Sequence, residues 1–193
     1  MLTLADVIEA LQGVRPEFPT PGITEAIVDS RHAIPGSLFV ALKGERTDGH
    51  SYIDDAFNNG ARLALIDREI DPLIPVLDLR QPLDLSAALP ALPFAIRVED
   101  SLSALQKIAA FWRLRFNVRV IGITGSVGKS TTKELTAEIL SQRYRTLKNQ
   151  GNLNNEIGLP LTLLQLGPGH ERVVLEMGFY QAGDITLLCQ IAR

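Results

Sequence analysis

A glycine-rich loop between an apolar run and a helical pattern constrains the fold of this chain most. Residues 122–132 read Gly-Ile-Thr-Gly-Ser-Val-Gly-Lys-Ser-Thr-Thr. The β-branched run at 118–123 predicts a buried strand, and residues 133–142 predict a helix. That helix places three apolar residues on one side, Leu135, Ile139 and Leu140. A loop that joins a strand to a helix directs backbone N–H groups and the positive end of the helix dipole at an anion. The sequence therefore predicts an α/β fold with an anion site at the end of one strand.

The loop also carries side chains suited to a nucleoside triphosphate. Lys129 supplies a mobile cation for the outer phosphates, and Ser130 offers a hydroxyl to a phosphate-bound Mg²⁺. The glycine spacing departs from G-x-x-x-x-G-K-[ST], because Ile123 stands at the first glycine position. A glycine-rich turn followed by an exposed lysine is the structural alternative. We expect the nucleotide to contact the residues Gly125, Ser126, Val127, Gly128, Lys129, Ser130 and Thr131.

A second segment supports the nucleotide interpretation. Residues 172–178 read Arg-Val-Val-Leu-Glu-Met-Gly, an apolar run that predicts a parallel strand with Glu176 at its carboxyl end. Ligands of open α/β sheets bind outside the carboxyl ends of the strands. Mg²⁺ takes one or two protein oxygens together with phosphates and waters. We therefore expect Glu176 and Ser130 to share a Mg²⁺ ion, and the alternative is a solvated acid at a strand end.

Composition limits the class of protein. A length of 193 residues allows one large or two small domains. The net charge of −3 gives no electrostatic support for binding nucleic acid or an anionic membrane. We expect the single cysteine, Cys189, to be a buried thiol in a reducing compartment, because it lies in an apolar helical pattern. The sequence shows no secretory leader or membrane span, so we expect a cytoplasmic protein.

Periodicity predicts two α/β units joined by a helix. Thr3 and Asp6 form a capping-box pattern at the start of a helix that runs to Leu11. Residues 70–93 contain five prolines and predict an irregular segment with a short strand at 75–79. The other predicted elements of the first unit are strands at 27–28, 37–42, 63–67 and 95–98 and a helix at 52–59 ending at Gly60. We expect the first domain at 1–99, a connecting helix at 100–116, and a partial ATP-binding domain at 117–193, with a further strand at 144–147 and a helix at 184–193.

Three segments, in this order, resemble the Mur ligases of bacterial peptidoglycan synthesis. The first begins with Asp29-Ser30-Arg31 and continues through 34–44 and Asp48-Gly49-His50, and it is similar to the uridine-nucleotide-binding domain of that family. The second is the loop at 124–131, whose glycine spacing is the one that these ligases use. The third is the Asn-rich segment, Gly151-Asn152-Leu153-Asn154-Asn155 and the residues after it. The Asn-rich segment is similar to that of the members that add D-alanyl-D-alanine.

The resemblance implies an ATP-dependent amide ligase with an α/β fold. It implies that ATP phosphorylates the terminal carboxylate of UDP-N-acetylmuramoyl-tripeptide, and that the amine of D-alanyl-D-alanine then attacks the acyl phosphate. Lys129 and Glu176 would be the catalytic residues, and Mg²⁺ the metal. The residues expected to contact the UDP substrate are Ser30, Arg31, His50, Asn152, Asn154 and Asn155. We further expect a monomer that inserts into no membrane and binds no nucleic acid.

Two departures from the family pattern matter. Gln181 stands where many of the D-alanyl-D-alanine-adding members carry a histidine that helps to hold a second metal. The rest of the ATPase sheet and the domain that binds the incoming amine would lie beyond Arg193, so we expect an inactive fragment of a longer enzyme. The alternatives are a family member that adds a single amino acid, and a non-catalytic UDP-sugar-binding module. A generic P-loop GTPase or kinase leaves residues 27–50 unexplained.

Overall fold

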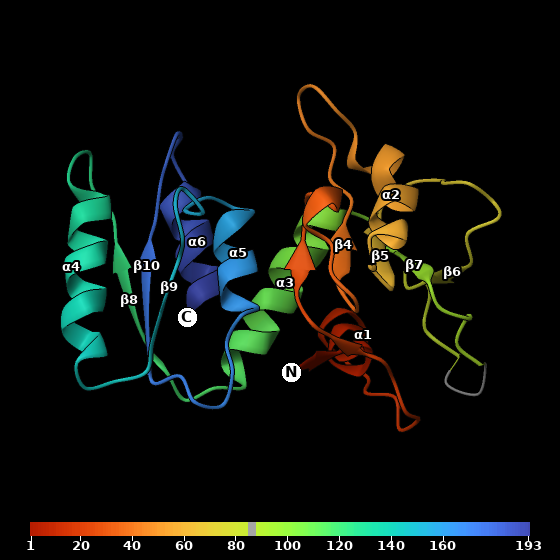
Figure 1. Cartoon of the computed structure of the whole chain (residues 1–193), viewed down its shortest axis with the longest axis horizontal. Coiled ribbons are helices and arrows are strands. Elements are labelled where there is room, and N and C mark those ends of the chain that lie inside the picture. Colours follow the sequence, from red (N-terminus) through yellow and green to blue (C-terminus); the bar gives the residue numbers. More distant parts are fainter. Residues whose placement is uncertain (85–87) are drawn as a thin grey trace. The chain divides into compact units, whose positions relative to one another are not determined.

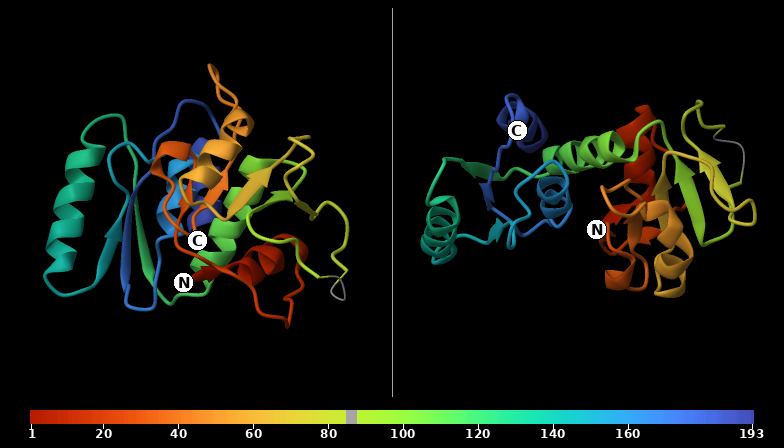
Figure 2. Two further views of the ribbon diagram at one scale, coloured as in Figure 1. Left: turned by 45° about the vertical axis from the view of Figure 1, so that its right-hand side comes forward. Right: turned by 90° about the horizontal axis from the view of Figure 1, so that it is seen from above.

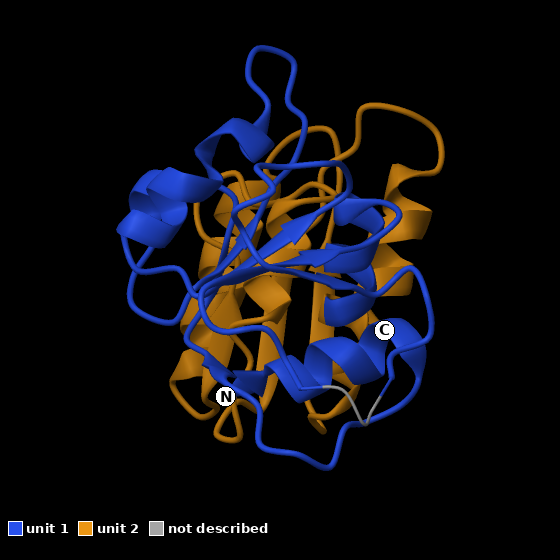
Figure 3. Cartoon of the chain, turned by 90° about the vertical axis from the view of Figure 1, so that its right-hand side faces the viewer, with its two compact units in different colours: residues 1–108 blue, residues 109–193 orange. Residues whose placement is uncertain are grey.

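The computed structural model describes residues 1–84 and 88–193, which form two compact units (Figure 3). Unit 1 spans residues 1–108 and unit 2 spans residues 109–193, so the division falls inside helix α3 (Ser101–Leu114). Part of the irregular segment predicted at 70–93, residues 85–87, lies outside the described residues. None of the helices in the described ranges is both long and apolar enough to cross a membrane.

Unit 1 is built on a five-stranded parallel sheet (Figure 1). The pairing aligns Ala26 with Leu38, Leu38 with Leu63, and Leu63 with Phe94. Because all strands run in one direction, the loops after them that carry the predicted substrate residues emerge at the same edge. The five strands predicted from the sequence in this region are confirmed. In sheet order they are β3 (Ala26–Ile27), β4 (Leu38–Val40), β5 (Leu63–Ile66), β7 (Phe94–Arg97) and β6 (Val76–Asp78).

The first helix, α1 (Leu4–Gln12), begins with the predicted capping box. The Thr3 hydroxyl accepts a hydrogen bond from the Asp6 N–H, and the Asp6 carboxylate accepts one from the Thr3 N–H. Gly13 ends the helix in the left-handed conformation at φ +73°, which favours glycine. The sequence pattern missed the short antiparallel pair of β1 (Leu2–Thr3) and β2 (Gly22–Ile23), because two-residue strands carry no periodicity.

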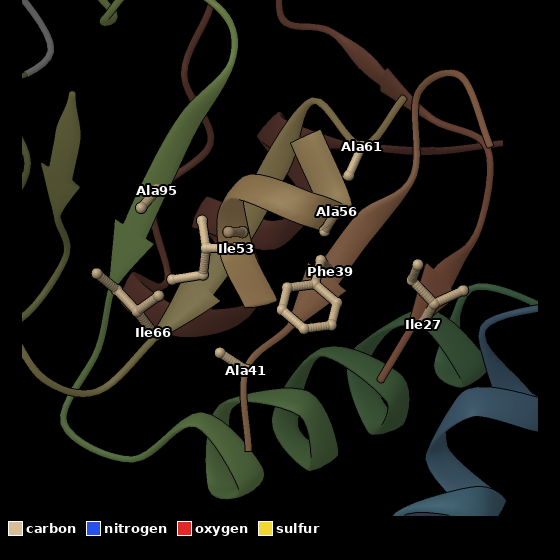
Figure 4. Close-up of a cluster of buried hydrophobic side chains, with 9 residues drawn as sticks. Ile27, Phe39, Ala41, Ile53, Ala56, Ala61, Ile66 and Ala95 are labelled. Atoms are coloured by element: carbon tan, nitrogen blue, oxygen red, sulfur yellow. The ribbon is translucent and has the colours of Figure 1, made fainter. Parts of the chain in front are cut away.

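One hydrophobic core of unit 1 lies between its sheet and helix α2 (Ile53–Asn58), which follows the 3₁₀ turn η2 (Gly49–Tyr52). Figure 4 shows Ile53 and Ala56 of α2 facing Phe39 of β4 and Ile66 of β5. Alternate residues of the same strands are buried on the opposite side of the sheet. Both faces of the parallel sheet are thus covered, which is the usual requirement for such sheets.

Unit 2 contains a three-stranded parallel sheet in the order β8 (Arg119–Ile123), β10 (Arg172–Glu176) and β9 (Thr146–Lys148). Figures 1 and 2 show helix α4 (Lys129–Ser141) on one face of this sheet, and α5 (Gly158–Leu163) and α6 (Asp184–Ala192) on the other. The predicted α/β class with parallel sheets is confirmed. Short α5 was not predicted, since six residues show too little of a helical period.

One sequence prediction about burial, that of Cys189, is wrong, and one helix begins earlier than predicted. Helix α4 begins at Lys129, four residues earlier than predicted, and its apolar residues Leu135 and Ile139 are 60% and 70% exposed. The helix packs on β10 and β9, and the side chains that face these strands belong to Lys133 and Ala137. Cys189 is exposed rather than buried, because α6 turns its neighbours Leu188 and Ile191 inward.

Candidate active site

The phosphate loop, residues 124–128, connects the end of β8 to the first turn of α4. Gly125 and Gly128 have φ values of +148° and +80°, a region that side chains with a Cβ rarely adopt. Gly128 is the N-cap of the 13-residue helix α4, so the free N–H groups of the first turn face the loop. Ser126, Val127, Ser130 and Thr131 are all exposed around this helix end. The loop and the helix end therefore have the geometry expected of an anion site, and they are exposed.

The side chain of Lys129 folds back over the loop. Its Nζ donates a hydrogen bond to the carbonyl oxygen of Gly125, with a distance of 2.7 Å. This bond keeps the ammonium beside the glycine turn rather than extended into solvent. The lysine is thus held next to the expected phosphate position by a bond that a phosphate oxygen can replace.

Glu176 lies at the carboxyl end of β10 and is 4% exposed. In the parallel ladder it is aligned with Ile123, the last residue of β8 before the phosphate loop. Its Oε1 accepts a 2.8 Å hydrogen bond from Asn154 Nδ2. Its Oε2 is buried and has no hydrogen-bond partner among the residues that the structure describes. Since buried carboxylate oxygens are normally paired, this oxygen is a candidate ligand atom.

These residues fit a Mg²⁺ ion bound with a nucleotide. Such an ion needs few protein ligands, because phosphates and waters complete its octahedron. Glu176 Oε2 provides an unpaired carboxylate oxygen, and Ser130 provides an exposed hydroxyl on the first turn of α4. Glu176 ends β10, and Ser130 lies beyond the end of β8, the neighbouring strand in the sheet, so this donor set agrees with the chemistry expected from the sequence.

The three asparagines of the Asn-rich segment are placed differently from one another. Asn154 contacts Glu176. The side-chain oxygen of Asn155 accepts hydrogen bonds from the N–H groups of Ile157 and Gly158 at the start of α5. Asn152 is exposed. Their assignment to a bound substrate stays a prediction, and Asn154 and Asn155 also have structural roles.

A cavity of about 220 Å³ lies beside the Asn-rich segment, at the start of α6. Gln181 lies at its border, and its backbone N–H and that of Tyr180 donate hydrogen bonds to the Asp184 carboxylate. These two bonds hold the pKa of Asp184 below its ordinary value. The cavity is lined by Asn155, Glu156, Gly178, Tyr180, Gln181, Asp184, Leu187 and Leu188.

In unit 1, Arg31 follows β3 at the carboxyl edge of the sheet. Its guanidinium binds the Asp29 carboxylate through two bonds, with distances of 2.6 Å for Nη2–Oδ2 and 2.9 Å for Nε–Oδ1. This pairing lowers the pKa of Asp29 to about 2. The Arg31 side chain is nevertheless 82% exposed and open to a ligand. Neighbouring Ser30 is buried, and its carbonyl oxygen accepts a hydrogen bond from Asn59 Nδ2.

His50 lies in a buried polar network in unit 1. Its Nδ1 is 2.7 Å from Asp48 Oδ1, and its Nε2 accepts a hydrogen bond from the Asp67 N–H. The imidazole holds the pKa of Asp48 below its ordinary value, and Arg68 binds Asp48 as well. Both ring nitrogens therefore contact the protein, which gives His50 a structural role beside the predicted substrate contact.

Asn149, whose side chain is buried, is the main residue of the site that was not predicted from the sequence. It bonds to the backbone of Glu176 and of Leu153. The only available signal was its position two residues before Gly151, between a predicted strand and the Asn-rich segment.

Comparison with known proteins connects these features. The profile of the Mur ligase family catalytic domain matches residues 23–113, and that of the Mur ligase middle domain matches residues 123–193. The UDP-N-acetylmuramoyl-tripeptide–D-alanyl-D-alanine ligase of Synechocystis is 43% identical over 171 residues, which cover 89% of this chain and 34% of the relative. The ligase of the same name from Bacillus subtilis is 38% identical over 193 residues, which cover 99% of this chain and 39% of the relative.

A solved structure gives the same result. The MurF ligase from Thermotoga maritima in complex with ADP is similar with a TM-score of 0.69 and 36% identity, over 87% of this chain and 35% of that one. The chain thus spans less than two-fifths of the length of these proteins. The resemblance that the phosphate loop, the Asn-rich segment and the Asp29-Ser30-Arg31 segment indicated is confirmed. The chain belongs to the Mur ligase family.

Proposed function

We propose that this chain supplies the ATP site and part of the UDP-substrate site of an ATP-dependent amide ligase. In the proposed reaction, the terminal carboxylate of UDP-N-acetylmuramoyl-tripeptide attacks the γ-phosphorus of ATP and releases ADP. The amine of D-alanyl-D-alanine then attacks the acyl phosphate carbonyl, so that an amide forms and inorganic phosphate leaves. The names of the Synechocystis and Bacillus subtilis relatives support this choice of substrates.

The observation that carries the proposal is the state of the Glu176 carboxylate. One of its oxygens is held by Asn154 and the other is buried without a partner in the described part of the chain. Glu176 is the last residue of β10, which pairs with the strand that leads into the phosphate loop. A structural carboxylate would have both oxygens paired. The unpaired oxygen supports a role as a metal ligand at the nucleotide.

We assign roles in the same reaction to the other site residues of unit 2. The N–H groups at the start of α4 bind phosphate oxygens, and Lys129 exchanges its bond to Gly125 for a bond to the outer phosphates. Ser130 and Glu176 would hold Mg²⁺, which when bound neutralises the charge that spreads over the transferred phosphoryl group. The protein thereby contributes positioning and charge neutralisation, which dominate catalysis of phosphoryl transfer.

Unit 1 is proposed to bind the uridine end of the substrate at the carboxyl edge of its sheet. Arg31 offers an exposed guanidinium that matches a pyrophosphate, and Ser30 lies beside it. His50 is the third proposed contact of unit 1. In unit 2, Asn152, Asn154 and Asn155 of the Asn-rich segment are also proposed to contact the substrate. We further propose that the protein is cytoplasmic, monomeric and binds no nucleic acid. Sedimentation of the purified chain tests the monomeric state.

Isothermal titration calorimetry of the 193-residue chain tests the proposal with two separate ligands. We expect binding of Mg·ATP and binding of UDP-N-acetylmuramoyl-tripeptide. Binding of the uridine ligand without ATP would identify a non-catalytic module, and failure to bind any uridine nucleotide would overturn the substrate assignment. In the complete protein, amide formation with a single amino acid instead of D-alanyl-D-alanine would contradict the proposed acceptor.

A further inference from the structure

We propose that Asn149 is a positioning residue that fixes the Glu176 carboxylate at the metal position. This inference rests on the proposed role of Glu176 as a metal ligand. Asn149 is 0% exposed and follows β9 directly. Its side-chain amide bonds to Glu176, which is 27 residues away, and to Leu153, which is four residues away.

The contact with Glu176 continues the pairing of β9 with β10 beyond the point where the backbone pairing ends. Strand β9 pairs with β10 only as far as Lys148, which is aligned with Val174. The chain then turns away, and Gly151 has a φ of +50°. The Asn149 side chain takes over the pairing, because its Oδ1 accepts from the Glu176 N–H and its Nδ2 donates to the Glu176 carbonyl oxygen, each with a distance of 2.9 Å. A planar amide presents donor and acceptor together, as a peptide unit of a strand does.

A third bond of the same side chain reaches the Asn-rich segment. Nδ2 also donates to the carbonyl oxygen of Leu153, with a distance of 2.8 Å. The next residue, Asn154, is the one that holds Glu176 Oε1. Asn149 therefore fixes the backbone of Glu176 and also the segment that orients its carboxylate. Only Oε2 is left for a ligand among the described contacts of this carboxylate.

The backbone of Asn149 connects this arrangement to the phosphate loop. Its carbonyl oxygen accepts a 3.0 Å hydrogen bond from Nζ of Lys133, which is 2% exposed and lies one turn beyond Lys129 in α4. The same Nζ lies 3.1 Å from Glu134 Oε1. One residue thus links the helix that carries the phosphate site to the strand end that carries the carboxylate. Metal ligand distances tolerate only about 0.2 Å, so such a link affects affinity.

The test compares two variants of the 193-residue chain with a matched control. Asn149→Leu keeps the branched shape of the side chain, with a somewhat larger volume, and removes all three side-chain bonds. Asn149→Ser is smaller and leaves room for water, so it serves as the second variant if the leucine variant does not fold. Thr162→Val is the control, because Thr162 is also buried in unit 2 and its hydroxyl donates one bond, to Gly158. Binding of Mn²⁺ in the presence of ATP is measured by electron paramagnetic resonance. The melting temperature and the exchange rate of the Glu176 amide proton are measured in parallel.

We expect the Asn149 variants to bind Mn²⁺ at least about tenfold more weakly, the range typical of lost support behind a metal ligand. The Glu176 amide proton should exchange faster in both variants. Thr162→Val should lower the melting temperature without changing Mn²⁺ affinity. Unchanged Mn²⁺ affinity in the Asn149 variants would overturn this inference and leave the proposed function intact. Failure of the unaltered chain to bind Mn²⁺ with ATP would overturn the proposed role of Glu176 itself.

Discussion

The two candidate binding regions of this chain differ in where their polar side chains find partners. In unit 2, Glu176 is held by Asn149 and Asn154, which come from other segments, and one carboxylate oxygen stays unpaired in the described chain. In unit 1, Arg31 binds Asp29 and His50 binds Asp48, each only two residues away. The first arrangement is built by the tertiary fold and leaves Glu176 Oε2 as the candidate ligand atom. The second combines these local pairs with the bond from the Asp67 N–H to His50 Nε2, and a ligand must compete with or add to existing pairs.

The largest expected effect separates the two regions directly. Lys129→Ala in the complete enzyme should reduce turnover about 1000-fold, because the variant lacks a cation at the transferred phosphate. Affinity for the UDP substrate should stay unchanged, since that ligand is proposed to bind unit 1. Phosphate release and calorimetry measure the two quantities. Lys107→Ala, at an exposed position of α3, is the control. Near-normal turnover of Lys129→Ala would refute the role given to the loop.

Glu176→Gln tests whether the unpaired oxygen is functional. The substitution keeps the size of the side chain and an oxygen for Asn154 but removes the negative charge. We expect turnover to fall about 100-fold, in the range that loss of one electrostatic contact to a transition state produces. Glu138→Gln, an exposed change on α4, should leave the rate unchanged. A glutamine variant that keeps full activity at saturating Mg²⁺ would exclude Glu176 as a metal ligand.

The sequence predicted the parts of this comparison that depend on local pattern. The phosphate loop could be placed because glycines at a strand-to-helix junction have a specific backbone geometry, and Glu176 because an apolar run ended in an acid. The capping box of α1 follows from a spacing of three residues. The exposed positions of Leu135 and Ile139 could not be foreseen, because burial on α4 depends on which strands neighbour the helix. The role of Asn149 could not be predicted, because one partner, Glu176, is 27 residues away and the other, Leu153, lies on a turn.

His50→Ala tests the local side of the comparison. Removal of the imidazole leaves Asp48 and the Asp67 N–H without this partner, so we expect a loss of about 2 kcal/mol in the free energy of unfolding. Urea denaturation followed by circular dichroism measures it. His32→Ala, at an exposed position, should have no such effect. Unchanged stability with a loss of uridine-nucleotide affinity would show that His50 acts as a substrate contact without the structural role, and would remove this difference between the units.

Arg31→Ala is the counterpart of that test. Since the guanidinium is exposed and its pair with Asp29 is superficial, we expect little change in stability. Affinity for the UDP substrate should fall about tenfold, the effect of losing one charge-assisted hydrogen bond. Calorimetry with uridine diphosphate measures the change, and Arg80→Ala is the control, because Arg80 forms the same kind of pair with Asp78. Equal affinities of the two variants would place the pyrophosphate away from Arg31.

The smallest expected effect concerns a local pair with no part in binding. Burial raises the pKa of Asp6, but hydrogen bonds from Thr3 and Arg15 together outweigh it and lower the pKa below its ordinary value. Because the folded-state pKa is the lower one, the carboxylate stabilises unit 1 above about pH 4, and this contribution is lost as the pH falls through the folded-state value.

Asp6→Asn should lower the free energy of unfolding by about 1 kcal/mol at pH 7 and by less at pH 3. Urea denaturation at both pH values measures this, with the exposed Asp54→Asn as control. An equal cost at both pH values would show that the bonds of Asp6 act without its charge, in contrast to the charge-dependent role proposed for Glu176.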